Sequence, residues 1–226
     1  MSYQIENVLV IRRSLFDELG AFQGLNFEPE KYLKAILSRG SNFFVGRSEA
    51  ENNPNYKQII PYALIAFRKT VLHYVRGKKA GEQRLIAKGS IGVGGHMNEG
   101  DESLFAMDEQ AYRAGVEREV NEEIKIDTPF EDQIVALLND DSTDVGRVHL
   151  GIVHVFKLTE PKVEKREAMI TGLTFLPKKV ELNLEVARKV QVMLQAEVEG
   201  QVQVRTARPA SQMRSCRFAS GPPDAK

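Results

Sequence analysis

The sequence is poor in cysteine and has no surplus of charge of either sign. Cys216 is the only cysteine among 226 residues, which excludes an internal disulfide and a zinc site built from cysteines, and which favours a reducing compartment. The 31 basic and 31 acidic residues cancel, so no overall field draws the chain to a nucleic acid polymer or to an anionic membrane. Any polyanion that it binds must be held by a local group of residues.

Long apolar runs are also missing. No segment approaches the roughly 20 apolar residues that a membrane-spanning helix needs, and residues 1–6 show no basic region followed by an apolar one. We therefore expect a cytoplasmic protein without a membrane partner. No internal repeat is found, and a 42% apolar chain of this length can bury one well-packed core.

What is present is a succession of segments with the apolar spacing of strands and helices. Apolar runs predict strands, and apolar residues three and four apart predict helices. Strands on both sides of a long helix favour an α+β fold with a mixed sheet between helices. We expect strands at residues 6–11, 42–46, 62–68, 71–75, 85–93, 133–138, 148–158 and 169–176, helices at 28–37, 108–124 and 182–194, and surface loops at 51–55, 76–83 and 139–142.

The composition changes near the C-terminus. Residues 201–226 carry arginines among Ser, Pro and Ala with little apolar periodicity, which is typical of disorder. We expect one domain over residues 1–200, followed by a disordered tail over residues 201–226.

The chemistry is concentrated in one helical segment. Glu119, Glu122 and Glu123 are spaced i, i+3 and i+4, so they share one helix face and repel one another. Magnesium takes oxygen ligands and keeps several waters, so carboxylates from one helix can bind it and leave positions open for phosphate oxygens. Clustered glutamates alone are more often a solvated face, but Gly94 and Gly95 upstream could let the backbone bend around a ligand.

These residues together resemble the Nudix box, G-x5-E-x7-R-E-U-x-E-E-x-G-U, in which U is apolar. Gly95 matches the opening glycine, and the second half is matched in order by Arg118, Glu119, Val120, Glu122, Glu123 and Ile126. The box thus spans residues 95–126. The segments 90–96, 139–141 and 145–151 extend the likeness to a bacterial branch of Nudix proteins known as predicted phosphoesterases.

Three departures from the pattern bear on the site. Asp101 stands where the first glutamate is expected, and Lys125 replaces the late glycine. The separation from Asp101 to Arg118 is 118 − 101 = 17 against 8 in the pattern, an insertion of about nine residues in the loop or at the helix start, where added length costs little.

The resemblance implies an α/β/α sandwich and a hydrolase that cleaves a diphosphate linkage in a small-molecule substrate of the nucleoside diphosphate type, with water as nucleophile. It implies Mg²⁺ or Mn²⁺ as cofactor, held by Glu119, Glu122 and Glu123 beside Gly95, with Arg118 orienting a glutamate. The base is left open among Glu122, Asp101 and Asp141. Nudix domains commonly pair, so a homodimer is consistent with the resemblance.

Several basic residues outside the helix are candidates for substrate contact. Lys88, Arg147 and His149 could contact phosphate, although basic residues at strand ends usually face solvent. His149 and His154 lie five residues apart, so a regular strand would direct them to opposite faces. We expect one of them in the core. His96 follows the glycines and is as readily a loop histidine as a phosphate contact.

Two other functions remain alternatives. One is a Nudix-fold protein that binds a ligand without turnover, because the longer spacing has moved Asp101. The other is an isomerase acting on an isoprenoid diphosphate, against which the place of Cys216 in the tail argues.

Overall fold

Two long parallel strands form the centre of the fold, β4 (Tyr56–Phe67) and β10 (His149–Leu158). The computed structural model describes residues 6–76, 89–101, 108–166 and 170–177. β9 (Phe130–Asn139) pairs antiparallel with β10. The sheet is therefore mixed, and the fold is α+β as the sequence predicts.

The sheet runs in the order β12-β5-β4-β10-β9-β2. Beside this path, β1 and β7 pair with β4, β3 pairs with β1, and β6 pairs with β5. β8 and β11 form a small sheet of their own. The remaining strands are β1 (Asn7–Arg12), β2 (Gly24–Asn26), β3 (Asn42–Gly46), β5 (Thr70–Arg76), β6 (Gly89–Ser90), β7 (Gly92–Val93), β8 (Ile124–Ile126), β11 (Val163–Lys165) and β12 (Ile170–Pro177).

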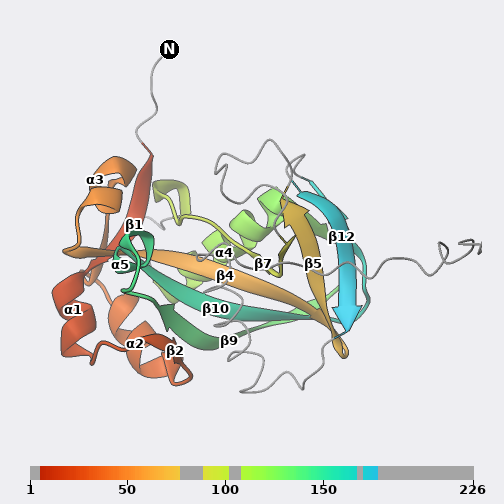
Figure 1. Ribbon diagram of the computed structural model, residues 1–226, viewed down its shortest axis with the longest axis horizontal. Helices are drawn as coiled ribbons and strands as arrows, with labels where there is room; N and C mark the ends of the chain where they lie inside the picture. The colour runs from red at the N-terminus through yellow and green to blue at the C-terminus, as the bar shows by residue number, and fades with distance from the viewer. Residues whose placement is uncertain (1–5, 77–88, 102–107, 167–169, 178–226) are drawn as a thin grey trace, which may run out of the picture.

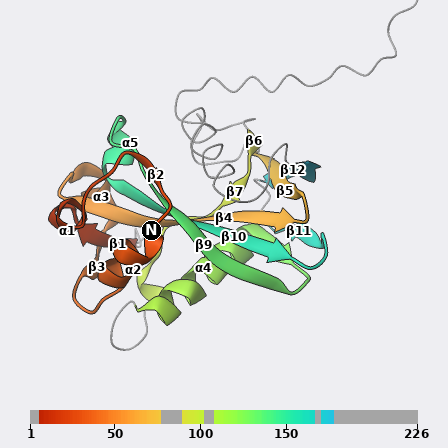
Figure 2. The ribbon, with the colours of Figure 1, turned by 90° about the horizontal axis from the view of Figure 1, so that it is seen from below.

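The helices are grouped at one end of the sheet and along one of its faces. α1, α2 and α3 lie at the end where β4 begins, whereas β5 and β12 lie at the other (Figure 1), and Figure 2 shows α4 running along one face. The bounds are α1 (Arg13–Glu18), α2 (Pro29–Ile36), α3 (Arg47–Asn52), α4 (Glu109–Glu123) and α5 (Asp144–Arg147), with a short 3-10 helix η2 (Glu99–Asp101). No helix within the described ranges has the length and apolar character for a membrane span.

The main core lies between one face of the sheet and the helices that cover it, which are α1, α2 and α4. Tyr112 and Val116 of α4 are buried there with Ile59 and Ala63 of β4. His154 belongs to this face, since it is fully buried and its Nε2 lies 2.8 Å from the Tyr112 hydroxyl. The prediction that one strand histidine packs in the core is confirmed.

One predicted loop is wrong at its first two residues, although residues 53–55 do form a turn. Residues 51–55 were expected to be irregular, but Glu51 and Asn52 end α3. The helix forms because Ala50 is fully buried beside Val8 and Val10, and because Arg47 Nε pairs with Glu51 Oε1 at 2.8 Å one turn later.

β4 begins six residues before the predicted strand start, because its first half pairs with β1 and β10. Lys57 and Gln58 are both fully buried there, which an apolar pattern cannot indicate. The helix at 182–194, the tail at 201–226 and Cys216 lie outside the described residues.

Candidate active site

The helix that carries the glutamates is fixed at both ends. Asp108 accepts a hydrogen bond from the Ala111 amide at 2.9 Å and so caps α4. At the other end, the Arg166 amide donates to the Glu123 carbonyl at 2.9 Å, and its guanidinium donates to the Asn121 carbonyl at 2.8 Å. The C-terminal turn of α4, which bears Glu119, Glu122 and Glu123, is therefore held against the small sheet.

Gly94 and Gly95 permit two close contacts that no side chain would allow. A Cβ on Gly94 would lie 1.9 Å from the carbonyl oxygen of Pro61, and a Cβ on Gly95 would lie 2.2 Å from Glu119 Oε2. The Glu119 carboxylate therefore occupies the space that a side chain at position 95 would fill. The first glutamate of the cluster and the bend at Gly95 meet, although 24 residues separate them in the sequence (119 − 95).

Arg118 holds two of the three glutamates. Its Nη2 lies 2.6 Å from Glu119 Oε1, and its Nη1 lies 2.7 Å from Glu122 Oε1. The Glu119 side chain is 13% exposed and that of Glu122 is 58% exposed. Arg118 thus offsets the repulsion within the cluster and sets the orientation of Glu119.

The three atoms nearest to a Cβ at Gly95 all belong to Glu119. Glu122 turns to Arg118 instead, and Glu123 is half-buried at the helix end. Within the described residues no three acidic, histidine or cysteine side chains meet at one point. Asp101 ends η2, but its side chain and residues 102–107, where the insertion falls, lie outside the described part.

Asp141, one of the candidate bases, is held by two cations. Its Oδ1 accepts from the ammonium of Lys57 at 2.7 Å, and its Oδ2 lies 3.0 Å from the Arg13 guanidinium. The bond from Lys57 and its charge, together with Arg13, outweigh burial and hold the pKa of the Asp141 carboxyl below its ordinary value. A carboxylate engaged in this way is a weak proton acceptor.

Lys57 was missed by the sequence analysis. The ammonium is fully buried and donates also to Asn139 Oδ1 at 2.6 Å and to the Gly146 carbonyl at 2.9 Å. Burial lowers the pKa of the Lys57 ammonium, and Asp141 opposes that effect. The residue ties the β9–α5 loop to the start of β4.

His149 and His96 form a second histidine environment on the sheet face opposite His154. Their ring centroids are 5.8 Å apart, and His149 Nδ1 lies 2.6 Å from the Val145 carbonyl oxygen. Burial lowers the pKa of both imidazoles, that of His96 to about 4, with help from the positive charge of Arg47. Both rings are neutral at pH 7. His96 Nε2 is buried without a partner among the described residues.

Of the other two predicted substrate contacts, the structure describes one. Arg147 forms an ion pair with Asp144 within α5, and its side chain is half-exposed. Lys88 lies outside the described residues. Their predicted roles remain predictions.

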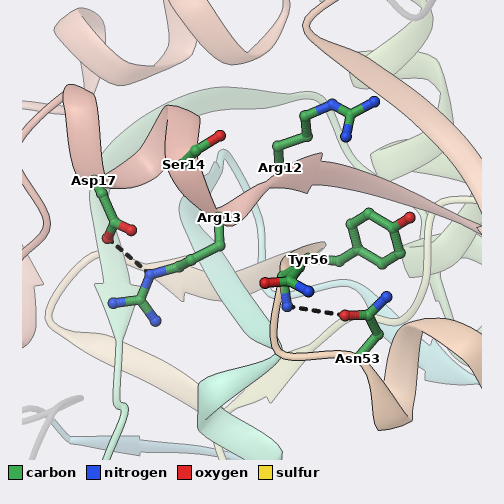
Figure 3. A pocket seen from close by; sticks show the side chains of 7 residues that line it. Arg12, Arg13, Ser14, Asp17, Asn53 and Tyr56 are labelled. Carbon is green, nitrogen blue, oxygen red and sulfur yellow. Dashed lines mark hydrogen bonds and ion pairs between the residues drawn. The ribbon is translucent and has the colours of Figure 1, made fainter.

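A cavity of about 440 Å³ opens at a different place, where β1 passes into α1. It is lined by Arg12, Arg13, Ser14, Asp17, Asn53, Asn55 and Tyr56 (Figure 3). None of the candidate site residues from the sequence lines it, although Asn53 and Asn55 belong to the predicted loop at 51–55. The other lining residues come from the end of β1, from α1 and from the start of β4, where no motif marks them.

One curated protein and two solved structures are similar to this chain. No family model matches the chain. Protein YmaB of Bacillus subtilis (strain 168) is 41% identical over 142 residues, which cover 61% of this chain and 67% of that protein.

Among solved structures, Tm1382, a candidate Nudix hydrolase, superimposes with a TM-score of 0.60 and 29% identity over 76% of this chain and 86% of its own. The Nudix domain of Shewanella oneidensis NrtR, solved with ADP ribose, is more distant. Its TM-score is 0.41 at 12% identity, over 63% of this chain and 86% of that chain.

Proposed function

Because the chain belongs to the Nudix hydrolase superfamily, we propose that it is a divalent-metal-dependent hydrolase that cleaves a diphosphate linkage in a substrate of the nucleoside diphosphate type. The contact between the Glu119 carboxylate and the bend at Gly95 is the observation that carries this proposal. It brings a carboxylate oxygen beside the backbone of two glycines, Gly94 and Gly95, where no side chain blocks access to the backbone. Carboxylate and carbonyl oxygens are ligands that Mg²⁺ and Mn²⁺ accept.

In this proposal Glu119, Glu122 and Glu123 hold the metal together with the backbone at Gly95. A metal ion held there would polarise phosphoryl oxygens and lower the pKa of a water bound to it. Arg118 keeps Glu119 turned toward Gly95 through their 2.6 Å contact. Glu122 is our choice as base over Asp141. Its side chain is 58% exposed against 30% for Asp141, and Arg118 contacts Oε1 of Glu122, whereas Lys57 and Arg13 engage both oxygens of Asp141.

The proposal is tested by incubating the full chain with Mg²⁺ or Mn²⁺ and a panel of diphosphate compounds. The panel includes nucleotide sugars, dinucleoside polyphosphates, NADH, ADP-ribose, CoA and nucleoside triphosphates, and phosphate release is measured after phosphatase treatment. We expect turnover of at least one compound, lost when EDTA removes the metal. Glu119→Gln should reduce turnover at least 100-fold.

Glu117→Gln is the matched control, since Glu117 is exposed on the same helix and the substitution removes the same charge. Once a panel member is confirmed as substrate, the proposal would be contradicted if the Glu119→Gln variant hydrolysed that compound at the parent rate.

Ligand binding without turnover is the second candidate. It is favoured by the engagement of Glu119 and Glu122 with Arg118, which a metal would have to displace. Calorimetry that detects binding of a panel member, with no hydrolysis of any member in either metal, would establish this function in place of the first.

A further inference from the structure

The cavity between β1, α1 and the turn before β4 presents hydrogen-bond donors that the protein itself does not use. Within the described residues, Arg12, Ser14 and Tyr56 make no side-chain hydrogen bond, and Asn53 uses only Oδ1, which accepts from the Asn55 amide at 3.1 Å. Three of these side chains end in a donor group and the fourth retains a free amide nitrogen. They line one cavity from two segments of the chain, residues 12–14 and 53–56.

The charge balance of the cavity favours an anion. Arg13 is neutralised, because its Nε lies 2.8 Å from Asp17 Oδ1 and its Nη2 lies 3.0 Å from Asp141 Oδ2. Arg12 has no acidic partner in the described part of the chain. Figure 3 shows Arg13 turned toward Asp17, whereas Arg12 extends on the other side of the strand, away from that ion pair. One positive charge is therefore left for a ligand.

Arg12 is also held in place by aromatic contacts. The centre of its guanidinium lies 5.4 Å from the centroid of the Phe43 ring, and Phe43 packs edge-on against Tyr56 at 5.6 Å. Stacking on an aromatic ring leaves the edge donors of a guanidinium available, and their planar fork matches the geometry of a phosphate group. The same ring therefore places Arg12 beside Tyr56, which also lines the cavity.

We propose that this cavity is a binding site for a phosphate group of a small molecule, recognised by Arg12 with Ser14, Asn53 and Tyr56. Its volume of about 440 Å³ suits a small ligand and not a folded partner. The site is separate from the glutamate cluster, so the proposal does not depend on hydrolysis.

The test uses inorganic phosphate as the probe and the full chain in EDTA, so that metal-dependent binding at the glutamates does not contribute. Phosphate is titrated while its ³¹P resonance is followed at constant ionic strength. Arg12→Gln should weaken binding about tenfold, because it removes a charge-assisted hydrogen bond.

Arg68→Gln is the matched control. Arg68 is exposed and lies over the ring of Phe67 at 5.0 Å, so it reproduces the charge and the stacking of Arg12 away from the cavity. Its substitution should leave the affinity unchanged, as should Glu119→Gln. Equal losses in Arg12→Gln and Arg68→Gln would show nonspecific attraction, and either that result or the absence of binding overturns the proposal.

Ser14→Ala and Tyr56→Phe give a second reading in case Arg12→Gln impairs folding. Each removes one hydroxyl from the cavity and leaves the charge of the chain unchanged. A severalfold loss of affinity in either variant supports the site, and parent affinity in both contradicts it.

Discussion

The buried ammonium of Lys57 lies 2.7 Å from Oδ1 of Asp141, and this contact joins the first residues of β4 to the loop between β9 and α5. Lys57 is fully buried whereas Asp141 is 30% exposed. The cost of burying the ammonium is offset by Asp141, Asn139 and two backbone carbonyls. The pair is an anchor for the start of the two central strands.

Asp141→Asn should therefore destabilise the protein strongly. The substitution leaves Lys57 without its counter-charge in a site that water does not reach, and such changes cost about 3 kcal/mol. Urea unfolding at pH 7 measures the effect. Asp144→Asn is the control, because Asp144 is 94% exposed and its loss should change the free energy of unfolding by less than about 0.5 kcal/mol.

The half-buried histidine His96 predicts a loss of stability at mildly acidic pH. Its folded-state pKa of about 4 lies below the ordinary 6.5, so the unfolded chain binds a proton more readily. The stabilisation is fully present above pH 6.5 and is lost as the pH falls toward 4, by up to about 3 kcal/mol. His149 acts in the same direction.

Unfolding free energies measured between pH 7 and 4.5 should fall less steeply in His96→Asn than in the parent. Direct titration of the His96 ring by NMR provides the independent check. A His96 pKa near 6.5 would contradict the prediction.

Much of this architecture follows from the sequence, since apolar runs and a capping residue suffice to locate elements whose buried faces are apolar. The strand predicted at 148–158, which is β10, and the helix predicted at 108–124, which is α4 with its cap at Asp108, are examples. The early start of β4 could not be predicted, because Lys57 and Gln58 are buried polar residues whose environment is made by β1 and β10. α1 and α3 are only six residues long, too short for a clear periodic signal.

The candidate site, too, could be predicted from the sequence only in part. The spacing of the glutamates places them on one helix face, but it does not determine which one reaches the bend. That depends on the path of residues 93–98 past β4 and β1, where the Leu9 amide donates to the Met97 carbonyl at 3.0 Å. The cavity at Arg12 could not be inferred either, because its lining residues meet only through the pairing of Arg12 with Tyr56.

Arg118→Lys should lower turnover without unfolding the chain. A lysine keeps the positive charge but cannot contact Glu119 and Glu122 at the same time in the geometry of the guanidinium. We expect kcat to fall about tenfold or more while KM changes little, because Arg118 positions a glutamate and does not bind the substrate. Equal kcat values for the variant and the parent would remove Arg118 from the proposed site.

Gly95→Ala is the sharpest test of the contact on which the enzymatic proposal depends. The new Cβ would lie 2.2 Å from Glu119 Oε2, so the carboxylate must turn away, which the end of a flexible side chain can do at little cost to the fold. Turnover should therefore fall by about 100-fold or more, as it would if a metal ligand were removed. The melting temperature should change by only about 2 to 4 °C. Gly100→Ala is the control, because among the described residues a Cβ there meets only Asn98 Oδ1, at 3.2 Å. If Gly95→Ala turned over substrate as fast as Gly100→Ala, the approach of Glu119 to the bend would have no part in catalysis.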